Sequence, residues 1–275
     1  TGIYYLDLAM ELAAAGLPVS VINPKSFHNF AKLMLKNSKT DAIDAQLLAE
    51  YGERMSPRLW TPPTSIQLEL RAIGRHINRL TGHRTRAKNE LHALKATQTT
   101  LLMLIEDEEE AINAFDKRIE RFRLAGRALI DNCPTLSAQF AHMIAAPGMG
   151  EISVFAALAE LTTLPVTLKS AQVSRHAGLD VRLTQSGTSI DKPGRISKGG
   201  NAYLRSAMYM PALTAIRCDP NVKAFYEALV ARGKRKMQAI VAVMRKYLTG
   251  LWACMRAGED FSTAKLFSDK HTQKA

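Results

Sequence analysis

The chain has 275 residues, 47% of them hydrophobic, and this composition excludes a wholly disordered protein because it supplies enough apolar surface for a core. The 37 lysines and arginines exceed the 25 aspartates and glutamates, which favours a polyanionic partner, nucleic acid ahead of membrane lipid, over an ordinary basic protein without one. Cys133, Cys218 and Cys254 lack the spacing of a zinc site or a disulfide framework, so we expect a reduced, cytoplasmic setting.

The first quarter of the chain has the pattern of a small α/β region. Residues 4–15 carry a helical apolar pattern, and the run at 17–22, rich in β-branched residues, predicts a buried strand. A second helix is predicted through residues 27–33, and a third over 41–49, where preceding hydroxyls can cap it. The chain starts with neither an initiator methionine nor a signal peptide, so we expect it to begin within a domain.

The next part of the chain carries two series of apolar residues at helical spacing. One series runs from Ile66 to Leu94 in steps of three and four, and a second with the same spacing runs from Ile112 to Phe122. Together they predict an antiparallel coiled-coil hairpin, formed within one chain or between two. The basic residues between Arg71 and Lys88 form either a solvated face or a nucleic-acid contact.

The region from about residue 136 to 262 is predicted to be mostly helical. A Pro-Gly-Met-Gly turn separates two helices and is similar to a helix-hairpin-helix module, in which Gly148 and Gly150 let backbone N–H groups approach a DNA phosphate. The alternative is a plain corner between two helices. The apolar stretch 237–255 is interrupted by two basic residues, so we predict a buried amphipathic helix and no membrane span.

Two carboxylates in the third predicted helix are the first candidates for chemistry. Asp41 and Asp44 are three residues apart, which places them on one helix face with Cβ atoms roughly 5–6 Å apart. A divalent cation held between them could neutralise charge on a phosphate during phosphoryl transfer. The alternative is a pair of surface acids offset by basic neighbours.

A polar loop, rich in Gly, Ser and Thr, is predicted between helices at 173–177 and 202–213. From Arg182 to Arg205 it holds five basic residues and one acid, and exposed polar loops on a rigid scaffold often carry binding or catalysis. The alternative is a flexible phosphate-binding loop without a covalent role. The candidate nucleophiles are Ser186, Ser189 and Ser197, and the candidate phosphate ligands are Arg195, Lys198 and Arg205.

A later basic run has Lys234, Arg235 and Lys236 at its centre, with no acid nearby in the sequence. It indicates binding to a phosphate backbone, or else an ordinary basic start of a helix. Tyr203 and Tyr209 raise the alternative of a tyrosine recombinase, but the sequence offers no convincing Arg/His/Arg set to accompany them. That alternative is disfavoured.

Five motifs occur in order along nearly the whole chain. They are Val21 to Pro24, Lys39 to Ala45, Pro147 to Gly150, Gln185 to Gly187 and Ser197 to Arg205. Read together, they closely resemble the DEDD insertion-sequence transposases of the one-ten and eleven-eleven group, to which phase-variation DNA invertases are related. This resemblance is more specific than any one motif.

The resemblance implies a mainly α protein with a partial α/β part at its N-terminus. Residues 1–62 would be the remnant of a RuvC-like, RNase H-type domain, and residues 63–127 a coiled-coil helical hairpin. Residues 136–262 would form a helical C-terminal transposase domain with a helix-hairpin-helix-like element, and residues 263–275 a polar tail.

In that family four acids bind metal, expected to be Mg²⁺, and Asp41 and Asp44 match the last two of them. The chain begins directly after the position of the second acid, so the resemblance implies a truncated metal-binding half. A catalytically impaired remnant that binds nucleic acid, and a metal-dependent nuclease without serine chemistry, are therefore the alternative functions.

The resemblance assigns the nucleophile to Ser186, which would attack a DNA phosphodiester and conserve the bond energy for rejoining. It further implies a DNA substrate, a structured bridge-type guide RNA, a homodimer or homotetramer, and a bacterial, nucleoid-associated location without a membrane. Basic surfaces suit the binding of an RNA that is recognised by its shape and its phosphate groups. The residues expected to contact nucleic acid are Gly148, Gly150, Arg195, Ser197, Lys198, Asn201, Arg205, Lys234, Arg235 and Lys236.

Overall fold

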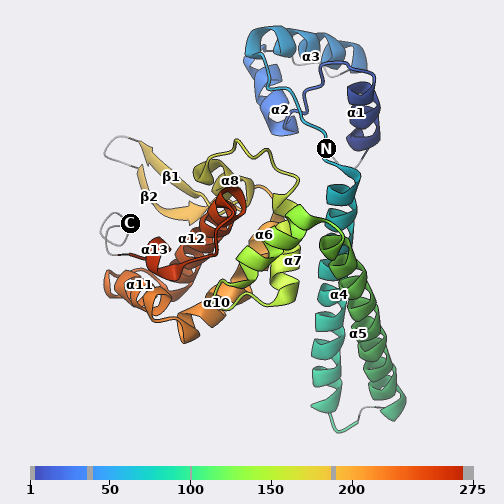
Figure 1. Cartoon of the computed structure of the whole chain (residues 1–275), viewed down its shortest axis with the longest axis vertical. Helices are drawn as coiled ribbons and strands as arrows, with labels where there is room; N and C mark the ends of the chain where they lie inside the picture. The colour runs from blue at the N-terminus through green and yellow to red at the C-terminus, as the bar shows by residue number, and fades with distance from the viewer. Residues whose placement is uncertain (1–3, 36–39, 100, 187–189, 269–275) are drawn as a thin grey trace. The chain divides into compact units, whose positions relative to one another are not determined.

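The computed structural model describes residues 4–35, 40–99, 101–186 and 190–268, and Figure 1 shows the whole chain. The chain divides into two compact units, residues 1–64 and residues 65–275. Helices dominate both units, as the sequence pattern predicts. None of the described helices is both long and apolar enough to cross a membrane.

Within its described residues the first unit contains three helices, α1 (Tyr5–Ala14), α2 (Pro24–Leu33) and α3 (Asp41–Met55). Both later helices begin at side-chain caps. The Asn23 carboxamide oxygen accepts from the Lys25 N–H at 2.9 Å, and the Thr40 hydroxyl oxygen accepts from the Ile43 N–H at 3.3 Å. Such caps satisfy backbone donors that a first helical turn leaves unpaired. All three predicted helices are confirmed.

The prediction of a strand at residues 17–22 was wrong. This segment has no regular secondary structure, and no strand occurs in the described part of the first unit. The Val19 carbonyl accepts from the Trp60 N–H at 2.7 Å, and the Ser20 hydroxyl donates to the Pro57 carbonyl at 3.2 Å. A strand needs a neighbouring strand to pair its backbone groups. Here a loop supplies isolated hydrogen bonds instead.

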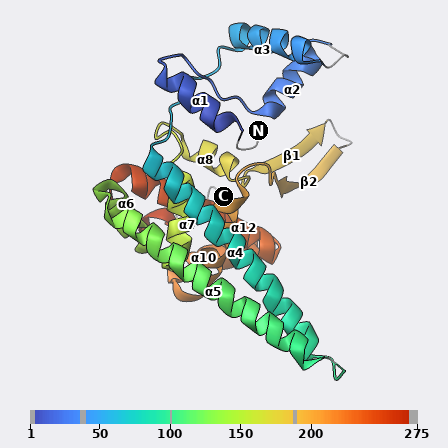
Figure 2. The same ribbon diagram turned by 90° about the vertical axis from the view of Figure 1, so that its right-hand side faces the viewer.

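The second unit begins with two long helices, α4 (Ser65–Lys95) and α5 (Leu102–Asp131). They run in opposite directions and lie side by side in both Figure 1 and Figure 2. The predicted apolar series supplies most of their buried side chains, among them Ile77 and Ile119, while the buried Ile130 lies beyond it. The exposed ion pair between Arg84 and Asp116, at 2.5 Å, adds little to the free energy of unfolding, because solvent screens such pairs.

Glycines let this helix pair dock on the rest of the second unit. A Cβ atom on Gly74 would lie 2.9 Å from the Ala159 Cβ, and one on Gly126 would lie 2.2 Å from the Phe155 ring. Phe155 and Ala159 belong to α7 (Glu151–Leu161), which therefore approaches both long helices closely.

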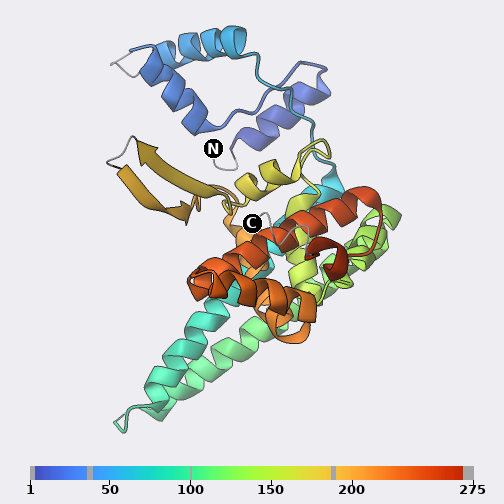
Figure 3. The same ribbon diagram turned by 90° about the vertical axis from the view of Figure 1, so that its left-hand side faces the viewer.

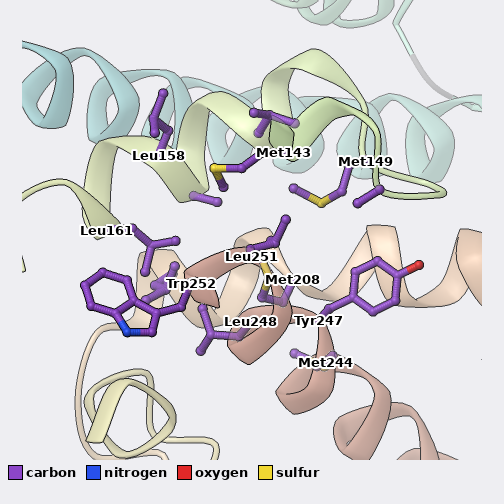
Figure 4. Packing of buried hydrophobic residues seen from close by; sticks show 14 of the residues in the cluster. Met143, Met149, Leu158, Leu161, Met208, Met244, Tyr247, Leu248, Leu251 and Trp252 are labelled. Carbon is purple, nitrogen blue, oxygen red and sulfur yellow. The ribbon is translucent and has the colours of Figure 1, made fainter. Parts of the chain in front are cut away.

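In the part of the second unit that the structure describes, seven further helices accompany α7. They are α6 (Pro134–Ile144), α8 (Ser170–His176), α9 (Ala202–Ala207), α10 (Tyr209–Cys218), α11 (Pro220–Ala231), α12 (Lys236–Ala257) and α13 (Thr263–Leu266). The predicted amphipathic helix is α12, and it lines the core with Tyr247, Leu248 and Trp252 (Figure 4). The indole N–H of Trp252 donates to the Leu168 carbonyl at 3.0 Å, so the buried ring keeps a polar partner.

The region predicted as a loop contains a two-stranded antiparallel ribbon, β1 (Val181–Ser186) and β2 (Ile190–Ile196), which Figure 3 shows. The register is irregular between Arg182 and Thr184, opposite the Pro-Gly pair of β2. The prediction of a loop was therefore wrong for the residues that form these two strands. Side chains alternate between the two faces of β1, and Val181 and Leu183 on one face cover Gly194 of β2. This short alternation is hard to recognise among many Gly, Ser and Thr residues.

The helix predicted over residues 202–213 is divided in the structure. It ends at Ala207, and α10 starts after Met208. Pro211 explains the division, because a proline has no N–H to donate and its ring collides with the carbonyl four residues earlier.

Candidate functional site

Asp41 and Asp44 lie in the first turn of α3, Asp41 exposed and Asp44 half-buried. The positive end of the helix dipole favours acids there, which by itself stabilises the helix. No cluster of three or more His, Cys, Asp or Glu side chains suited to a metal occurs within the described residues. Mg²⁺ often takes one or two protein carboxylates and completes its shell with water and phosphate oxygens. The two carboxylates fit such a partial site.

Ser186 is the last residue of β1, and its side chain is exposed. It pairs with Ile190 across the ribbon. Since side chains alternate along a strand, Ser186 shares a face of β1 with Arg182, at a spacing of about 13 Å. The candidate Ser189 lies outside the described residues.

Arginines face each other at the base of the ribbon. Arg182 is directly opposite Arg195, and both are exposed. Like charges in this arrangement are destabilising, and an anion between them would relieve the repulsion. The guanidinium of Arg182 also reaches the next turn, because a Cβ atom on Gly199 would lie 3.4 Å from its Nη2. The exposed Lys198 belongs to that turn.

The turn at residues 197–200 is held tightly by the segment before the ribbon. The Ser197 hydroxyl donates to the Asp180 carboxylate, and the Lys198 N–H donates to the Gly178 carbonyl at 3.1 Å. Gly200 has φ of +138°, and a Cβ atom there would lie 2.2 Å from the His176 carbonyl oxygen. Only glycine permits this approach.

Two side chains expected to contact nucleic acid have partners within the protein. The Asn201 carboxamide oxygen accepts from the Leu204 N–H at 3.0 Å and caps α9, while its Nδ2 donates to Glu160 at 2.5 Å. A guanidinium N–H of Arg205 donates to the Ala177 carbonyl at 2.8 Å. These contacts shape the turn, whereas Lys198 and Arg195 offer exposed charge.

Sequence reasoning missed Glu160, which is 2% exposed and paired with Arg75. The feature that could have revealed it is an acid within a helix whose residues are apolar on nearly every face. Such a helix is expected to be buried, and a buried carboxylate requires a partner.

The turn at Gly148 packs against the protein's own backbone. Gly148 has φ of +78°, and a Cβ atom there would lie 2.8 Å from the Pro211 carbonyl oxygen in α10. The Tyr247 hydroxyl donates to the Pro147 carbonyl at 2.9 Å, and burial, more than the nearby Asp219, raises the pKa of this phenol. Packing thus accounts for glycine at 148. Gly150 is exposed at the start of α7, where a phosphate contact stays a prediction.

Lys234, Arg235 and Lys236 are exposed at the beginning of α12. The Gln238 side-chain oxygen accepts from the Arg235 N–H at 3.0 Å and orders this first turn. The positive helix end adds to the three cationic side chains, so the local field attracts anions.

Comparisons with known proteins identify the class of protein. A family model described as "Transposase IS116/IS110/IS902 family" matches residues 142–227, and a second transposase model, of the DEDD type found in IS110, matches residues 1–99. Both folded units thus carry transposase sequence, and the chain belongs to the IS116/IS110/IS902 transposase family.

Individual relatives agree with this assignment. The "Pilin gene-inverting protein" of Moraxella bovis is 30% identical over 263 residues, which cover 95% of this chain and 80% of that protein. The protein of the same name from Moraxella lacunata has the same identity and coverage. The "Transposase for insertion sequence element IS1111A" of Coxiella burnetii is 23% identical over 284 residues, covering 90% of this chain and 73% of that protein.

Proposed function

We propose that this transposase cuts and rejoins DNA through Ser186, with Asp41 and Asp44 as ligands of a divalent metal, expected to be Mg²⁺. The observation that carries the proposal is the ribbon itself. It holds an exposed serine at its end, while Arg182, Arg195 and the nearby Lys198 gather positive charge at its base. A nucleophile and phosphate ligands about 13 Å apart on one ribbon suit contacts with neighbouring phosphates of a single DNA backbone.

The chemistry balances as a phosphoryl exchange. The Ser186 Oγ forms a bond to phosphorus while the bond from phosphorus to one deoxyribose oxygen breaks, and the serine proton ends on the released hydroxyl. Attack by a hydroxyl of another strand reverses the step, rejoins the DNA and returns the proton to Ser186. Mg²⁺, when bound at Asp41 and Asp44 of a partner subunit, would neutralise charge on phosphate oxygens.

The partners follow from charge and from the family. A formal net charge of +12 supports DNA as the substrate, and the basic beginning of α12 suits a second polyanion. We propose a structured bridge-type guide RNA for that role, acting with a homodimer or homotetramer of the chain. Action on DNA in the bacterial cytoplasm, at the nucleoid, belongs to the same proposal.

Covalent trapping tests the serine mechanism. The protein is incubated with element-end DNA, host RNA and Mg²⁺, separated on denaturing gels, and the DNA-linked peptide is identified by mass spectrometry. We expect an adduct at Ser186 that Ser186→Ala abolishes, while Ser206→Ala, a change at an exposed serine of α9, leaves it intact. An adduct that persists in Ser186→Ala, or that maps to Ser189 or Ser197, contradicts the assignment.

Two other outcomes separate the alternatives. DNA cutting without any adduct, lost in Asp41→Asn and Asp44→Asn, would replace the serine mechanism with a metal-dependent nuclease. Binding without cutting by the wild-type chain would leave a catalytically impaired protein that binds nucleic acid.

A further inference from the structure

Glu160 is a buried carboxylate in the most apolar part of the second unit. It lies near the end of α7, where Leu158, Ala159 and Leu161 are each at most 1% exposed. Removing an ionised carboxylate from water costs several kcal/mol unless partners replace the lost hydration. The identity and geometry of its partners therefore indicate why an acid occupies this position.

Two side chains from distant segments supply these partners. Arg75 of α4 donates from Nε to one Glu160 oxygen at 2.6 Å and from Nη2 to the other at 2.9 Å. Asn201 donates from Nδ2 to the second oxygen at 2.5 Å. The Arg75 guanidinium also lies over the Tyr203 ring, 5.0 Å from its centroid. One carboxylate thus joins α4, α7 and the start of α9.

The orientation of Asn201 is fixed at both ends of its carboxamide. The oxygen accepts from Leu204 and the nitrogen donates to Glu160, so a flipped amide would break both bonds. Its backbone N–H donates to the His176 carbonyl at 2.7 Å. Asn201 is therefore the fixed end of the turn that contains Lys198.

Lys198 is in a conformation that needs such support. Its φ is +51°, in the left-handed region that a residue with a side chain seldom adopts. Strained backbone of this kind persists only where surrounding contacts determine it, and it often occurs at functional sites. The exposed Lys198 belongs to the turn that the Arg182 guanidinium reaches at Gly199, beside the pair of Arg182 and Arg195 at the base of the ribbon.

We propose that Glu160 is a positioning residue for the cutting reaction: through Asn201 it holds the turn at residues 197–200 so that Lys198 meets a DNA phosphate. This inference rests on the proposed function. Glu160 is not a catalytic residue, because it is buried and contacts Arg75 and Asn201 instead of substrate.

Reversing the direction of the hydrogen bond from Asn201 to Glu160 tests the role of Glu160. In Glu160→Gln, an amide opposes the Asn201 amide or the Arg75 guanidinium, so one donor loses its acceptor. In Asn201→Asp, two carboxylates oppose each other. The double variant Glu160→Gln/Asn201→Asp restores one donor and one acceptor between positions 160 and 201 and the original charge, and an aspartate at 201 still caps α9. It does not restore the bond from Arg75 Nη2, which shares the Glu160 oxygen that Asn201 reaches.

A second variant keeps the test informative if either single change prevents folding. Asn201→Ser retains a good helix cap but is too short to donate to Glu160, which keeps its Arg75 pair. The matched control is Glu151→Gln, which removes the half-buried ion pair between Glu151 at the start of α7 and Arg123 of α5.

The main readout is the rate of adduct formation at saturating DNA beside the Kd for DNA. We expect Glu160→Gln and Asn201→Ser to slow the rate about 100-fold, as misplacement by about 1 Å commonly does. We expect the Kd to change less than about threefold, because phosphate contacts elsewhere dominate affinity. The double variant should recover to within about fivefold of wild type, and Glu151→Gln should match wild type.

Hydrogen exchange supplies a readout that does not depend on cutting. Peptides covering residues 197–204 should exchange faster in Glu160→Gln and in Asn201→Ser and return to the wild-type rate in the double variant, with α4 unchanged. If wild type forms no adduct but exchange follows this pattern, the serine mechanism fails and the anchoring by Glu160 stands. Wild-type rates and exchange in Glu160→Gln and Asn201→Ser, or a double variant no better than the single ones, overturn the inference.

Discussion

The two units of the chain form helices equally well but differ in the core that those helices build. Within the described residues of the first unit, the buried hydrophobic side chains are Ala9, Phe30 and Leu47, while Leu33 and Leu35 are 76% and 82% exposed. The second unit buries a continuous cluster that includes Leu158, Leu248 and Trp252. Periodicity and caps suffice to form helices, but a core requires surfaces that fit one another.

This difference separates the two parts of the proposed chemistry. Asp41 and Asp44 lie on a helix with one buried apolar side chain, Leu47, whereas the turn of Lys198 is bonded to a dense core. We therefore expect the acids to tolerate movement that the turn cannot tolerate. The following variants test this contrast, from the largest expected effect to the smallest.

Trp252→Ala should have the largest effect. Trp252 is fully buried, and truncating a buried aromatic costs about 3–5 kcal/mol of the free energy of unfolding. Urea denaturation followed by circular dichroism measures the loss. Val166→Ala, at a side chain that is 66% exposed, is the control, with an expected change within about 0.5 kcal/mol. Equal effects of the two changes would refute the contrast in packing.

Gly200→Ala should cost about 2–3 kcal/mol, because the added Cβ meets the His176 carbonyl and the backbone angle is strained. Gly258→Ala is its matched control. It has a left-handed φ of +66° with open space around it, so about 1 kcal/mol is expected from strain alone. Thermal melting compares the two. A smaller loss for Gly200→Ala would show that the turn can move away from His176.

Leu47→Ala should act within the first unit. Leu47 is 2% exposed, and its truncation should cost about 2 kcal/mol, the lower end for leucine, because few buried neighbours surround it. Limited proteolysis should cut residues 4–64 faster while the core around Trp252 keeps its hydrogen-exchange protection. Faster exchange at Trp252 as well would mean that the units unfold together.

Acid should weaken the pairing of α4 and α5 slightly, through His76. Burial, followed by the charges of Arg79, Arg118 and Arg121, lowers the pKa of His76 from 6.5. The unfolded chain therefore binds the proton first, and this part of the stability is full above pH 6.5 and is lost as the pH falls through the lowered pKa. Compared with His76→Gln, wild type should show a larger decrease in Tm between about pH 7.5 and about pH 5. Parallel decreases would exclude His76 as the cause.

Much of the fold could be predicted because its signals are local. The series from Ile66 to Leu94 predicted α4, and Thr40 predicted the start of α3. The strand at residues 17–22 was predicted wrongly because β-branched residues indicate extended backbone without indicating a partner strand. The β1–β2 ribbon was missed for a different reason. Each strand has its partner strand close by in the sequence, but the composition of this segment is typical of a loop.

The candidate site was predicted less completely, because proximity in space is absent from sequence spacing. The sequence singled out Ser186 and Lys198, but it did not show that Arg182 is opposite Arg195. It also assigned Asn201 to nucleic acid, whereas the structure uses this side chain to join Glu160 to α9. The sequence cannot predict the contact between Asn201 and Glu160, because the two residues come together only in the folded chain.

The contact between Arg75, Glu160 and Asn201 also sets an order of assembly. Arg75 precedes Glu160 by 85 residues, and Asn201 follows Glu160 by 41. Contacts that close such long loops form after local helices, because the chain loses entropy before the contact stabilises it. During synthesis Arg75 and Glu160 leave the ribosome before Asn201 does, so their contact can form first. The turn of Lys198 is therefore expected to become ordered only after α4 and α7 have joined, so a growing chain pairs its buried carboxylate before it can position this lysine.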